Sequence, residues 1–281
     1  MQRSVGLMRT DMSMMTFRGR TNAIVEIGKR MCQSDDEWKQ KCAAMMELRA
    51  LLGEYALLQE AKKSKTRVHE REDQSASSSS SVDESLFTPE NIQTLTQPFR
   101  TTLLDLRSTV VKEACDAFAM LAASVGLAKS KTIIRDVFPT LLEARGTSNK
   151  VNTGAINQCI ESIIRTTPSR HIIGPVLQTL SSDTKNREIR ESCIRYLQLA
   201  LEYWTSTAVF EPLHAQLQVA IAASLSDASQ RSREIARHCY WKYTSLWPDE
   251  LEKIEALLAD GVKKHLKRPR KDLEVKTPFE V

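Results

Sequence analysis

Apolar residues recur along this chain at helical spacing, and five cysteines occupy the same place in that pattern. An apolar residue stands four positions before and four positions after each of these cysteines. Positions four apart lie on one face of an α-helix, so each cysteine is in the middle of an apolar stripe. The cysteines are Cys42, Cys115, Cys159, Cys193 and Cys239, preceded by Trp38, Val111, Ala155, Ile189 and Ile235 and followed by Met46, Ala119, Ile163, Leu197 and Tyr243.

The distance between these stripes predicts a repeat architecture. The last three cysteine intervals are about 34 to 46 residues, which is the period of helical hairpins of the HEAT and armadillo type. Each cysteine would then lie in the second helix of a two-helix unit. No strand-like alternation competes with this pattern. The sequence therefore predicts an all-α fold, an α-solenoid of about six HEAT-like helical hairpin repeats.

Start and stop signals place the first repeat near the N-terminus. A first helix is predicted over 21–33, and Ser34 to Glu37 reads S-x-x-E, a capping box that would open a long helix through Leu58. Pro89 is a good first-turn residue, so regular structure is expected to resume there. The second repeat then covers about 89–126.

The remaining repeats follow at similar intervals. The third repeat is predicted over about 130–166, and Pro168 begins the fourth. In the fifth repeat, Asp227 is expected to cap the second helix, with Gln230 at the third helical position, and Pro248 ends that helix. A last helix over about 248–266 would be half of a sixth repeat and would close the stack with a charged face.

Three polar segments set the predicted domain boundaries. Residues 1–20 have no clear period and are expected to form a disordered tail. Residues 64–86 include a run of serines that cannot bury a core, which predicts a flexible insertion within the first repeat junction. Residues 269–281 are expected to be a linker or tail. The helical array itself is predicted over 21–268.

Composition excludes a membrane protein and favours an intracellular one. There is no run of about 18 apolar residues, so no membrane span is expected, and the first 20 residues lack the apolar core of a secretory signal. Cysteines at equivalent places in successive repeats would be too far apart for a disulfide. Free, buried cysteines fit a reducing compartment, so we expect the cytoplasm.

The chain carries no recognisable catalytic or metal-binding motif. Phosphate-binding glycine loops, H-E-x-x-H and G-x-S-x-G are all absent, and so is C-x-x-C. The neighbours His238 and Cys239 could be read as a nucleophilic pair, but on a helix such a pair is usually packing plus surface. We therefore predict a non-catalytic protein without a cofactor or a metal site.

The informative residues lie at the turns inside each repeat, at the start of the second helices. Basic side chains gather there although the helix dipole prefers acids at a helix N-terminus, and Trp38 stands at the first of these turns. The predicted turn edge consists of Trp38, Lys39, Arg107, Ser108, Lys112, Asn149, Lys150, Lys185, Arg187, Arg190, Arg231, Arg233 and Arg237. Such an edge suits an acidic protein surface. Nucleic acid is the alternative partner, although interleaved aromatic residues are lacking.

Three segments of the chain resemble the TOG domains of the CLASP family of microtubule-associated proteins. The segment "DLRSTVVKEACDAFAML" from Asp105 is similar to the second repeat of those domains, and "DDEWKQKCAAMMELRALL" is similar to the first. The segment "DASQRSREIARHCYWKY" from Asp227 resembles the fifth, including the run Cys239, Tyr240 and Trp241. The resemblance covers about residues 20–268.

This resemblance implies a six-repeat HEAT array whose intra-repeat turns bind αβ-tubulin or the microtubule lattice. It also implies a monomeric domain of a longer chain that regulates microtubule growth in the cytoplasm, on the spindle or at the kinetochore. Carried over by position, the tubulin-binding residues would be Trp38 in the first turn, Arg107, Ser108 and Lys112 in the second, Lys150 in the third, Arg187 or Arg190 in the fourth, and Arg231 and Arg233 in the fifth.

Two alternatives stay open from the residues alone. One is a HEAT-repeat adaptor that binds another acidic protein or a nucleic acid. The other concerns a second basic cluster, which could be a solvated helix end, a nuclear-import-like patch or a site of attraction to an acidic polymer. That cluster consists of Lys263, Lys264, His265, Lys267, Arg268, Arg270 and Lys271.

Overall fold

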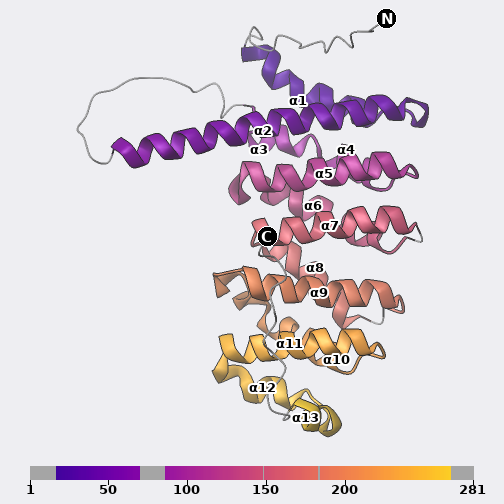
Figure 1. The fold of residues 1–281 in the computed structure, drawn as a ribbon, viewed down its shortest axis with the longest axis vertical. Coiled ribbons are helices and arrows are strands. Elements are labelled where there is room, and N and C mark those ends of the chain that lie inside the picture. The colour runs from indigo at the N-terminus through magenta and orange to yellow at the C-terminus, as the bar shows by residue number, and fades with distance from the viewer. Residues whose placement is uncertain (1–16, 70–85, 148, 183, 267–281) are drawn as a thin grey trace, which may run out of the picture. The chain divides into compact units, whose positions relative to one another are not determined.

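The computed structural model describes residues 17–69, 86–147, 149–182 and 184–266. Every regular element in those ranges is an α-helix or a short 3-10 helix, so the predicted all-α fold class is confirmed. The chain divides into two compact units, residues 1–167 and residues 168–281, and helical hairpins follow one another within each (Figure 1). Residues 1–16 of the predicted tail and the whole of 269–281 lie outside the described residues.

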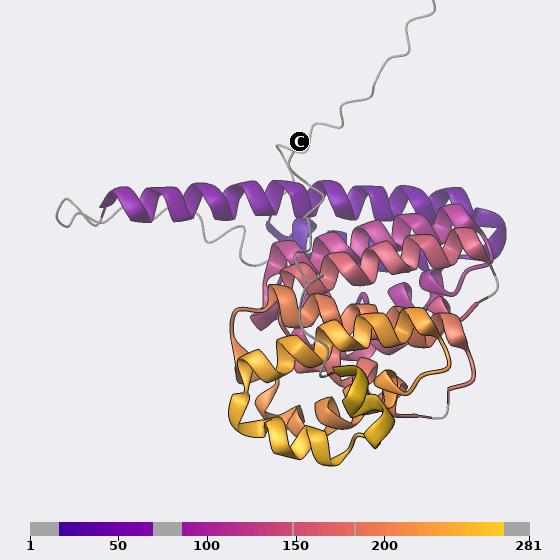
Figure 2. The same cartoon turned by 60° about the horizontal axis from the view of Figure 1, so that its bottom comes forward.

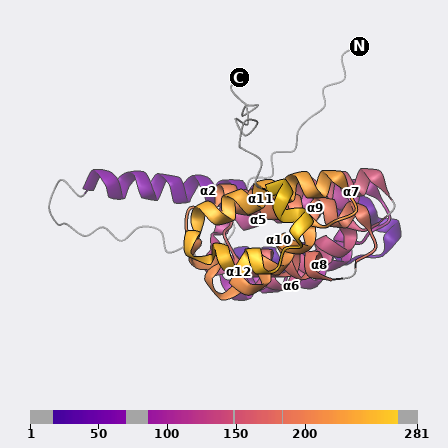
Figure 3. The same ribbon diagram turned by 90° about the horizontal axis from the view of Figure 1, so that it is seen from below.

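The first unit contains helices α1 to α7. In it α5 packs between α2 and α7, and α6 packs against α4 and α7. Seen from below, α5 and α7 form one layer and α6 lies in the other (Figure 3). The elements are α1 Phe17–Met31, η2 Asp35–Glu37, α2 Trp38–His69, α3 Pro89–Gln93, α4 Thr96–Leu103, α5 Ser108–Val125, α6 Leu127–Arg145 and α7 Lys150–Thr166.

The second unit contains helices α8 to α13. Helices α9 and α11 pack together, as do α8 and α10, so this unit also has two layers (Figure 3). The elements are α8 Arg170–Ser181, α9 Arg187–Tyr203, η3 Thr207–Val209, η4 Glu211–Leu213, α10 His214–Leu225, α11 Gln230–Leu246, η5 Pro248–Glu250, α12 Leu251–Ala256 and α13 Asp260–Leu266.

The cysteine pattern identifies the second helix of each hairpin. The five cysteines fall in α2, α5, α7, α9 and α11, and all five side chains are buried, as predicted. Cys115 and Cys159 are close neighbours, and the hydrogen bond between them, together with burial, raises the pKa of the Cys159 thiol. The flanking position Met46 departs from the pattern, since 57% of it is exposed.

Short polar side chains cap several of the helices. Asn149 accepts hydrogen bonds from two backbone amides at the start of α7, and Asn186 does the same for α9. Thr88 caps α3 ahead of Pro89, and Ser169 caps α8. Each cap satisfies backbone N–H groups that a helix leaves without an internal partner. Between α5 and α6, Gly126 adopts a φ of 76°, which a residue without a Cβ tolerates best.

Two predicted caps are wrong. Ser34 makes no side-chain capping bond, because residues 35–37 form a 3-10 turn in which the Glu37 amide donates to the Ser34 carbonyl oxygen at 3.0 Å. In the fifth repeat the capping residue is Ser229, whose side chain accepts from the Ser232 amide. Gln230 is therefore the first helical residue of α11. Asp227 lies two residues before the capping residue, and its carboxylate accepts the Ser229 amide within the turn.

Two helices differ in length from the prediction. Helix α2 continues to His69, six residues into the segment 64–86, and its C-terminal half extends beyond the other helices of its unit (Figure 2). Alanine and lysine after residue 60 have high helix propensity although they lack an apolar face. Residues 70–85 lie outside the described residues, so the predicted flexibility of that segment stays a prediction. The single helix expected over 248–266 is two short helices, α12 and α13.

A buried ion pair joins the first repeat to the second. Lys41 Nζ donates to Asp105 Oδ2 at 3.2 Å, and the two side chains are 1% and 4% exposed. The other carboxylate oxygen, Oδ1, accepts the backbone amide of Arg107 at 2.9 Å. Asp105 therefore holds its own turn in shape and also binds the helix of the preceding repeat.

The same arrangement recurs in the second unit. Arg190 Nε donates to Asp227 Oδ2 at 2.7 Å, and the Ser229 amide donates to Asp227 Oδ1 at 2.7 Å. Lys41 and Arg190 are each the fourth residue of a second helix, and Asp105 and Asp227 each stand three residues before the next second helix begins. We call Asp105 and Asp227 the turn aspartates. Each one ties a turn to the repeat before it.

Replacing Lys41 by Met tests the first of these ties. Removing one partner leaves the Asp105 carboxylate buried without its cation, so we expect Lys41→Met to lower the free energy of unfolding by about 3 to 5 kcal/mol. Urea titration measures this change. The double variant Lys41→Met with Asp105→Leu should recover much of the loss, since a buried ion pair can be replaced by apolar groups. Lys131→Met, at an exposed lysine of α6, is the matched control, and equal midpoints for it and Lys41→Met would contradict this role.

The Asp227 tie predicts a pH dependence. Burial would raise the pKa of Asp227, but the hydrogen bonds from Arg190 and the Ser229 amide outweigh it and the pKa is lowered. A lowered pKa stabilises the folded state above the unfolded value of about 3.9, and this contribution is lost as the pH falls through the native pKa. We expect Asp227→Asn to cost about 2 kcal/mol near pH 7 and progressively less below about pH 4.

Urea titrations of wild type and Asp227→Asn, from about pH 7 down to about pH 2, measure how the difference in their unfolding free energies decreases with pH. The control is Asp249→Asn, at an exposed carboxylate of η5, which should leave the difference from wild type near zero throughout. A penalty for Asp227→Asn that stays constant over the whole pH series would show that charge is not what Asp227 contributes.

Candidate functional site

Three of the predicted turns lie at the same end of neighbouring helices in the first unit. The first turn (residues 34–37) precedes α2, the second turn (104–107) precedes α5, and the third turn (146–149) precedes α7. Because α2, α5 and α7 run side by side, these turns follow one another along one edge of the unit (Figure 1). The sequence predicted this adjacency within the first unit correctly.

Exposed apolar side chains stand on these turns. Leu106 in the second turn is 90% exposed, and Val151, just after the third turn, is 68% exposed. Trp38 at the first turn is half-buried, with Lys39 Nζ 5.8 Å from the centre of its ring. The prediction missed Leu106 and Val151 because it looked for charge. The available signal was an apolar residue in the middle of a polar turn, D-L-R-S.

The cations of this edge stand beside the apolar residues. Arg107 is half-buried at the N-cap position of α5, and no hydrogen bond or ion pair joins its guanidinium to another described residue. Ser108 accepts a hydrogen bond from Asn149 Nδ2 at 3.4 Å, which links the second turn to the third. Lys150 is exposed at the first position of α7. These residues form, with Trp38, Leu106 and Val151, what we call the first-unit edge.

Lys112 belongs to a different surface from the turn residues. It lies one turn inside α5, where its Nζ pairs with Asp116 Oδ2 at 2.7 Å. Asp116 also lies 3.6 Å from Arg49 of α2, and Arg49 pairs with Glu113 at 3.0 Å. The hydrogen bond that Lys112 donates to Asp116 raises the pKa of Lys112. Lys112 is therefore part of an ion-pair network between α2 and α5.

The fourth turn (residues 182–186) and the fifth turn (226–229) are neighbours in the second unit, because α9 and α11 pack together. Arg187 at the start of α9 and Arg231 at the second position of α11 are both exposed. Arg187 Nε pairs with Glu191 at 2.7 Å, whereas no hydrogen bond or ion pair links Arg231 to another residue in the described part of the chain. We call Arg187 and Arg231 the second-unit cations.

Arg190 and Arg233 have structural partners. Arg190 pairs with Asp227 and donates to the Thr184 carbonyl oxygen at 2.6 Å. Arg233 Nη1 donates to the carbonyl oxygens of Asp227 and Ala228 at 2.7 and 2.9 Å. Both guanidinium groups thus satisfy acceptors of the fourth and fifth turns. The structure brings all four predicted arginines together but leaves Arg187 and Arg231 better placed to reach a partner.

A second carboxylate completes the contacts between these two turns. Glu191 accepts the Ser229 hydroxyl at 2.6 Å and Arg187 Nε at 2.7 Å. The hydrogen bond from Ser229 and the one from Arg187 lower the pKa of Glu191, although burial opposes them. Glu191 therefore stays charged near neutral pH and holds the start of α11 against α9.

Cys239, which the sequence offered as a possible nucleophile, is buried against a neighbouring helix. The Cys239 thiol donates to the Ile194 carbonyl oxygen at 3.8 Å, and complete burial raises its pKa, which opposes a nucleophilic thiolate. No group of three or more metal-ligating side chains was found within the described ranges. Among the described helices, none combines the length and apolar character needed to cross a bilayer.

Comparison with sequences of known proteins identifies CLIP-associating proteins among the relatives. The chain is 26% identical over 235 residues to CLIP-associating protein 1 of Xenopus tropicalis, which is 83% of this chain and 14% of that protein. It is 24% identical over 163 residues to the CLIP-associated protein of Arabidopsis thaliana, or 58% of this chain and 11% of that protein. The chain thus spans only a small fraction of the length of the curated relatives it matches.

Solved structures show the same fold. The TOG domain of C. elegans Zyg9 matches with a TM-score of 0.56 at 14% identity, covering 86% of this chain and 79% of that one. The CEP104 TOG domain also matches with a TM-score of 0.56, at 12% identity, covering 87% and 90%. The family described as "CLASP N terminal" matches residues 85–267. With most of its described helices inside that match, this chain belongs to the CLASP N-terminal family, and its fold is that of a TOG domain.

Proposed function

We propose that this chain is a non-catalytic, microtubule-regulating domain that binds αβ-tubulin through the turns of its repeats. The observation that carries the proposal is the first-unit edge, where apolar side chains on three adjacent turns stand beside the cations Arg107 and Lys150. Leu106 is 90% exposed, so the described residues leave most of its apolar surface uncovered. A cluster of exposed apolar side chains beside arginine and lysine is typical of a protein-binding surface.

The relatives support tubulin as the partner. One structurally similar protein, with a TM-score of 0.52 at 14% identity, comes from work on TOG–tubulin binding specificity in microtubule dynamics and mitotic spindle formation. Another comes from work on tubulin recruitment by microtubule polymerases with TOG domain arrays, with a TM-score of 0.55. These likenesses bear on the fold, and family membership connects that fold to microtubules. Association with the spindle or the kinetochore stays a prediction.

The turn residues divide the work of binding in this proposal. Trp38, Leu106 and Val151 would bury apolar surface against tubulin, and this burial would supply most of the affinity. Arg107, Lys150, Arg187 and Arg231 would attract the acidic tubulin surface and set the orientation of the complex. Arg190 and Arg233, predicted from the sequence as contact residues, would instead hold the fourth and fifth turns in the binding shape. Lys112 would contribute through the charge of its surface rather than through direct contact.

Nucleic acid is a poorer fit to the same surfaces. Proteins that bind single-stranded nucleic acid place aromatic rings between their cations. On the first-unit edge, Trp38 is the one aromatic residue, and its ring is half-buried beside Lys39. The remaining apolar residues of that edge are aliphatic, which suits a protein surface.

Replacing Leu106 by Ser tests the apolar part of the proposal. The side chain is 90% exposed, so the change should leave stability within about 0.5 kcal/mol. We expect it to weaken tubulin binding at least about 10-fold, because a central apolar contact is lost. Co-elution with tubulin on a sizing column measures the loss, and co-sedimentation with microtubules separates lattice binding from dimer binding.

The matched control for this variant is Leu57→Ser, since Leu57 is also exposed, at 68%, but lies far along α2 from its turn. If Leu57→Ser and Leu106→Ser bind tubulin equally well in both assays, the first-unit edge is not the binding surface. Circular dichroism of both variants confirms that the comparison is made between folded proteins.

The double variant Arg107→Gln with Arg231→Gln tests the cations. Neither side chain carries a structural ion pair in the described chain, so folding should be unaffected. We expect slower association with tubulin and a weaker dependence of affinity on salt, because fewer charges steer the encounter. Stopped-flow measurements at two ionic strengths report both. The control Lys131→Gln with Lys242→Gln removes the same charge at exposed sites away from the turns, and an equal effect would mean that only net charge matters.

A further inference from the structure

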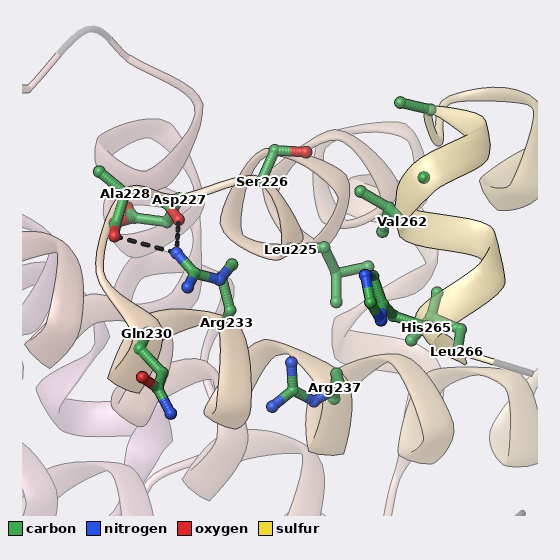
Figure 4. Close-up of a pocket in the computed structure, with 12 residues that line it drawn as sticks. Leu225, Ser226, Asp227, Ala228, Gln230, Arg233, Arg237, Val262, His265 and Leu266 are labelled. Carbon is green, nitrogen blue, oxygen red and sulfur yellow. Dashed lines mark hydrogen bonds between the residues drawn. The ribbon is translucent and has the colours of Figure 1, made fainter. Parts of the chain in front are cut away.

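The second unit contains a pocket that is not part of the tubulin contacts proposed above. It lies between the end of α10, the fifth turn, the N-terminal half of α11 and α13, and it has a volume of about 650 Å³. This volume lies within the range of sites that hold small ligands or a few peptide side chains. All of its lining residues belong to residues 225–266. In Figure 4, Leu225 lies between α11, which carries Arg233 and Arg237, and α13, which carries Val262 and His265.

The charge of the pocket is unbalanced toward the positive. Arg237 lines it and is half-buried, and within the described chain no side chain or carbonyl group pairs with its guanidinium. Arg233 contributes a second guanidinium, of which Nη1 is occupied by carbonyl oxygens. The one carboxylate in the lining, Asp227, is paired with Arg190 at 2.7 Å. The pocket therefore offers the guanidinium of Arg237, for which the described chain supplies no anion.

The floor of the pocket is apolar. Its accessible apolar residues are Val262, which is half-buried, and Ala259, which is exposed, and the buried side chains of Leu225 and Leu266 stand beside them. An inorganic anion or a sugar phosphate would satisfy the arginines but would leave this apolar floor against water. A nucleotide base would need a stacking surface, and the lining contains no aromatic side chain other than the imidazole of His265. A ligand that matches both parts carries a carboxylate next to an apolar group.

We propose that this pocket binds a short acidic peptide segment in which an aspartate or glutamate is next to a large apolar residue. The carboxylate binds the planar guanidinium of Arg237, which presents paired donors that match its geometry. The apolar side chain covers Val262 and Ala259. This inference goes beyond tubulin binding by the turns and does not depend on it, because Arg237 lies two helical turns inside α11.

A peptide-binding measurement with the whole 281-residue chain tests the site. The probe is a fluorescein-labelled peptide with Glu-Phe-Glu at its centre and Gly-Ser flanks, followed by fluorescence anisotropy at low salt. Two companion peptides carry Gln-Phe-Gln and Glu-Gly-Glu. We expect the first peptide to bind, and each companion to bind at least about 10-fold more weakly because it lacks half of the recognised chemistry.

Arg237→Gln is the decisive variant. It removes a charge that has no partner among the described residues, so it should preserve the structure and weaken binding of the Glu-Phe-Glu peptide at least about 10-fold. Lys242→Gln, on the same helix but outside the pocket lining, should bind as wild type does. Amide shifts of Ala228, Gly261 and Val262 in a two-dimensional NMR titration should move with the peptide and stay still in Arg237→Gln.

Three results would overturn the proposal. The first is no binding of the Glu-Phe-Glu peptide, and the second is binding that Arg237→Gln and Lys242→Gln reduce equally. The third is binding that the Glu-Gly-Glu peptide or inorganic phosphate reproduces, which would show a general anion site. Since no tubulin is present in these assays, their failure is separate from any failure of the tubulin proposal.

Discussion

The two turn aspartates are the interaction on which both units depend. Asp105 and Asp227 each accept a backbone amide of their own turn and a cation from the second helix of the preceding repeat. A stack of helical hairpins has few long-range contacts, since each repeat touches only its neighbours. A carboxylate that binds both its own turn and the preceding repeat therefore fixes the shape of the turn and its position relative to the neighbouring helix. Without these two residues, the turns would lose the geometry that any partner has to recognise.

The basic residues of the turns fall into two groups, according to whether they have partners within the fold. Arg190 and Arg233 donate hydrogen bonds to acceptors of the fourth and fifth turns. Arg107 and Arg231 have no such bonds in the described chain, and a partner can approach them without breaking an existing pair. An arginine that already pairs with a buried carboxylate gains little from a second acidic group, because its charge is satisfied. Position on the edge alone is thus a poor guide to which arginine contacts a partner.

The pocket beside α13 shows the opposite case. Arg237 was predicted as one more residue of the turn edge, and it lies two helical turns inside α11, where it lines a cavity beside the fifth turn. Within the described chain, this arginine has no anionic partner and stands near apolar side chains. A ligand of this site therefore needs both an anionic group and an apolar group. Sharing Arg233 between the fifth turn and this pocket places the two surfaces close together within the second unit, so a partner on one could influence the other.

Much of the architecture could be read from the sequence, because hydrophobic periodicity is a local property. The cysteine stripes predicted the five second helices, and the segments from Asp105 and Asp227 predicted the family. The helix starts at Ser34 and Asp227 were wrong because several short polar residues compete for each cap, and only the packed turn decides between them. The end of α2 was missed because helix propensity persists after the apolar face ends. The predicted tubulin-binding residues stay predictions, refined by their surroundings.

The sequence by itself determined the helical repeats, their order and the cluster of basic residues at their turns. The tertiary structure alone decided which charged side chains are paired within the fold and which can contact a partner. Pairs such as Lys41 with Asp105, or Arg190 with Asp227, join residues that are distant in sequence, and burial makes them strong. The exposure of Leu106 and the cavity beneath Arg237 likewise depend on what neighbouring repeats cover. Periodicity along one helix carries no information about that covering, because it arises only when helices pack.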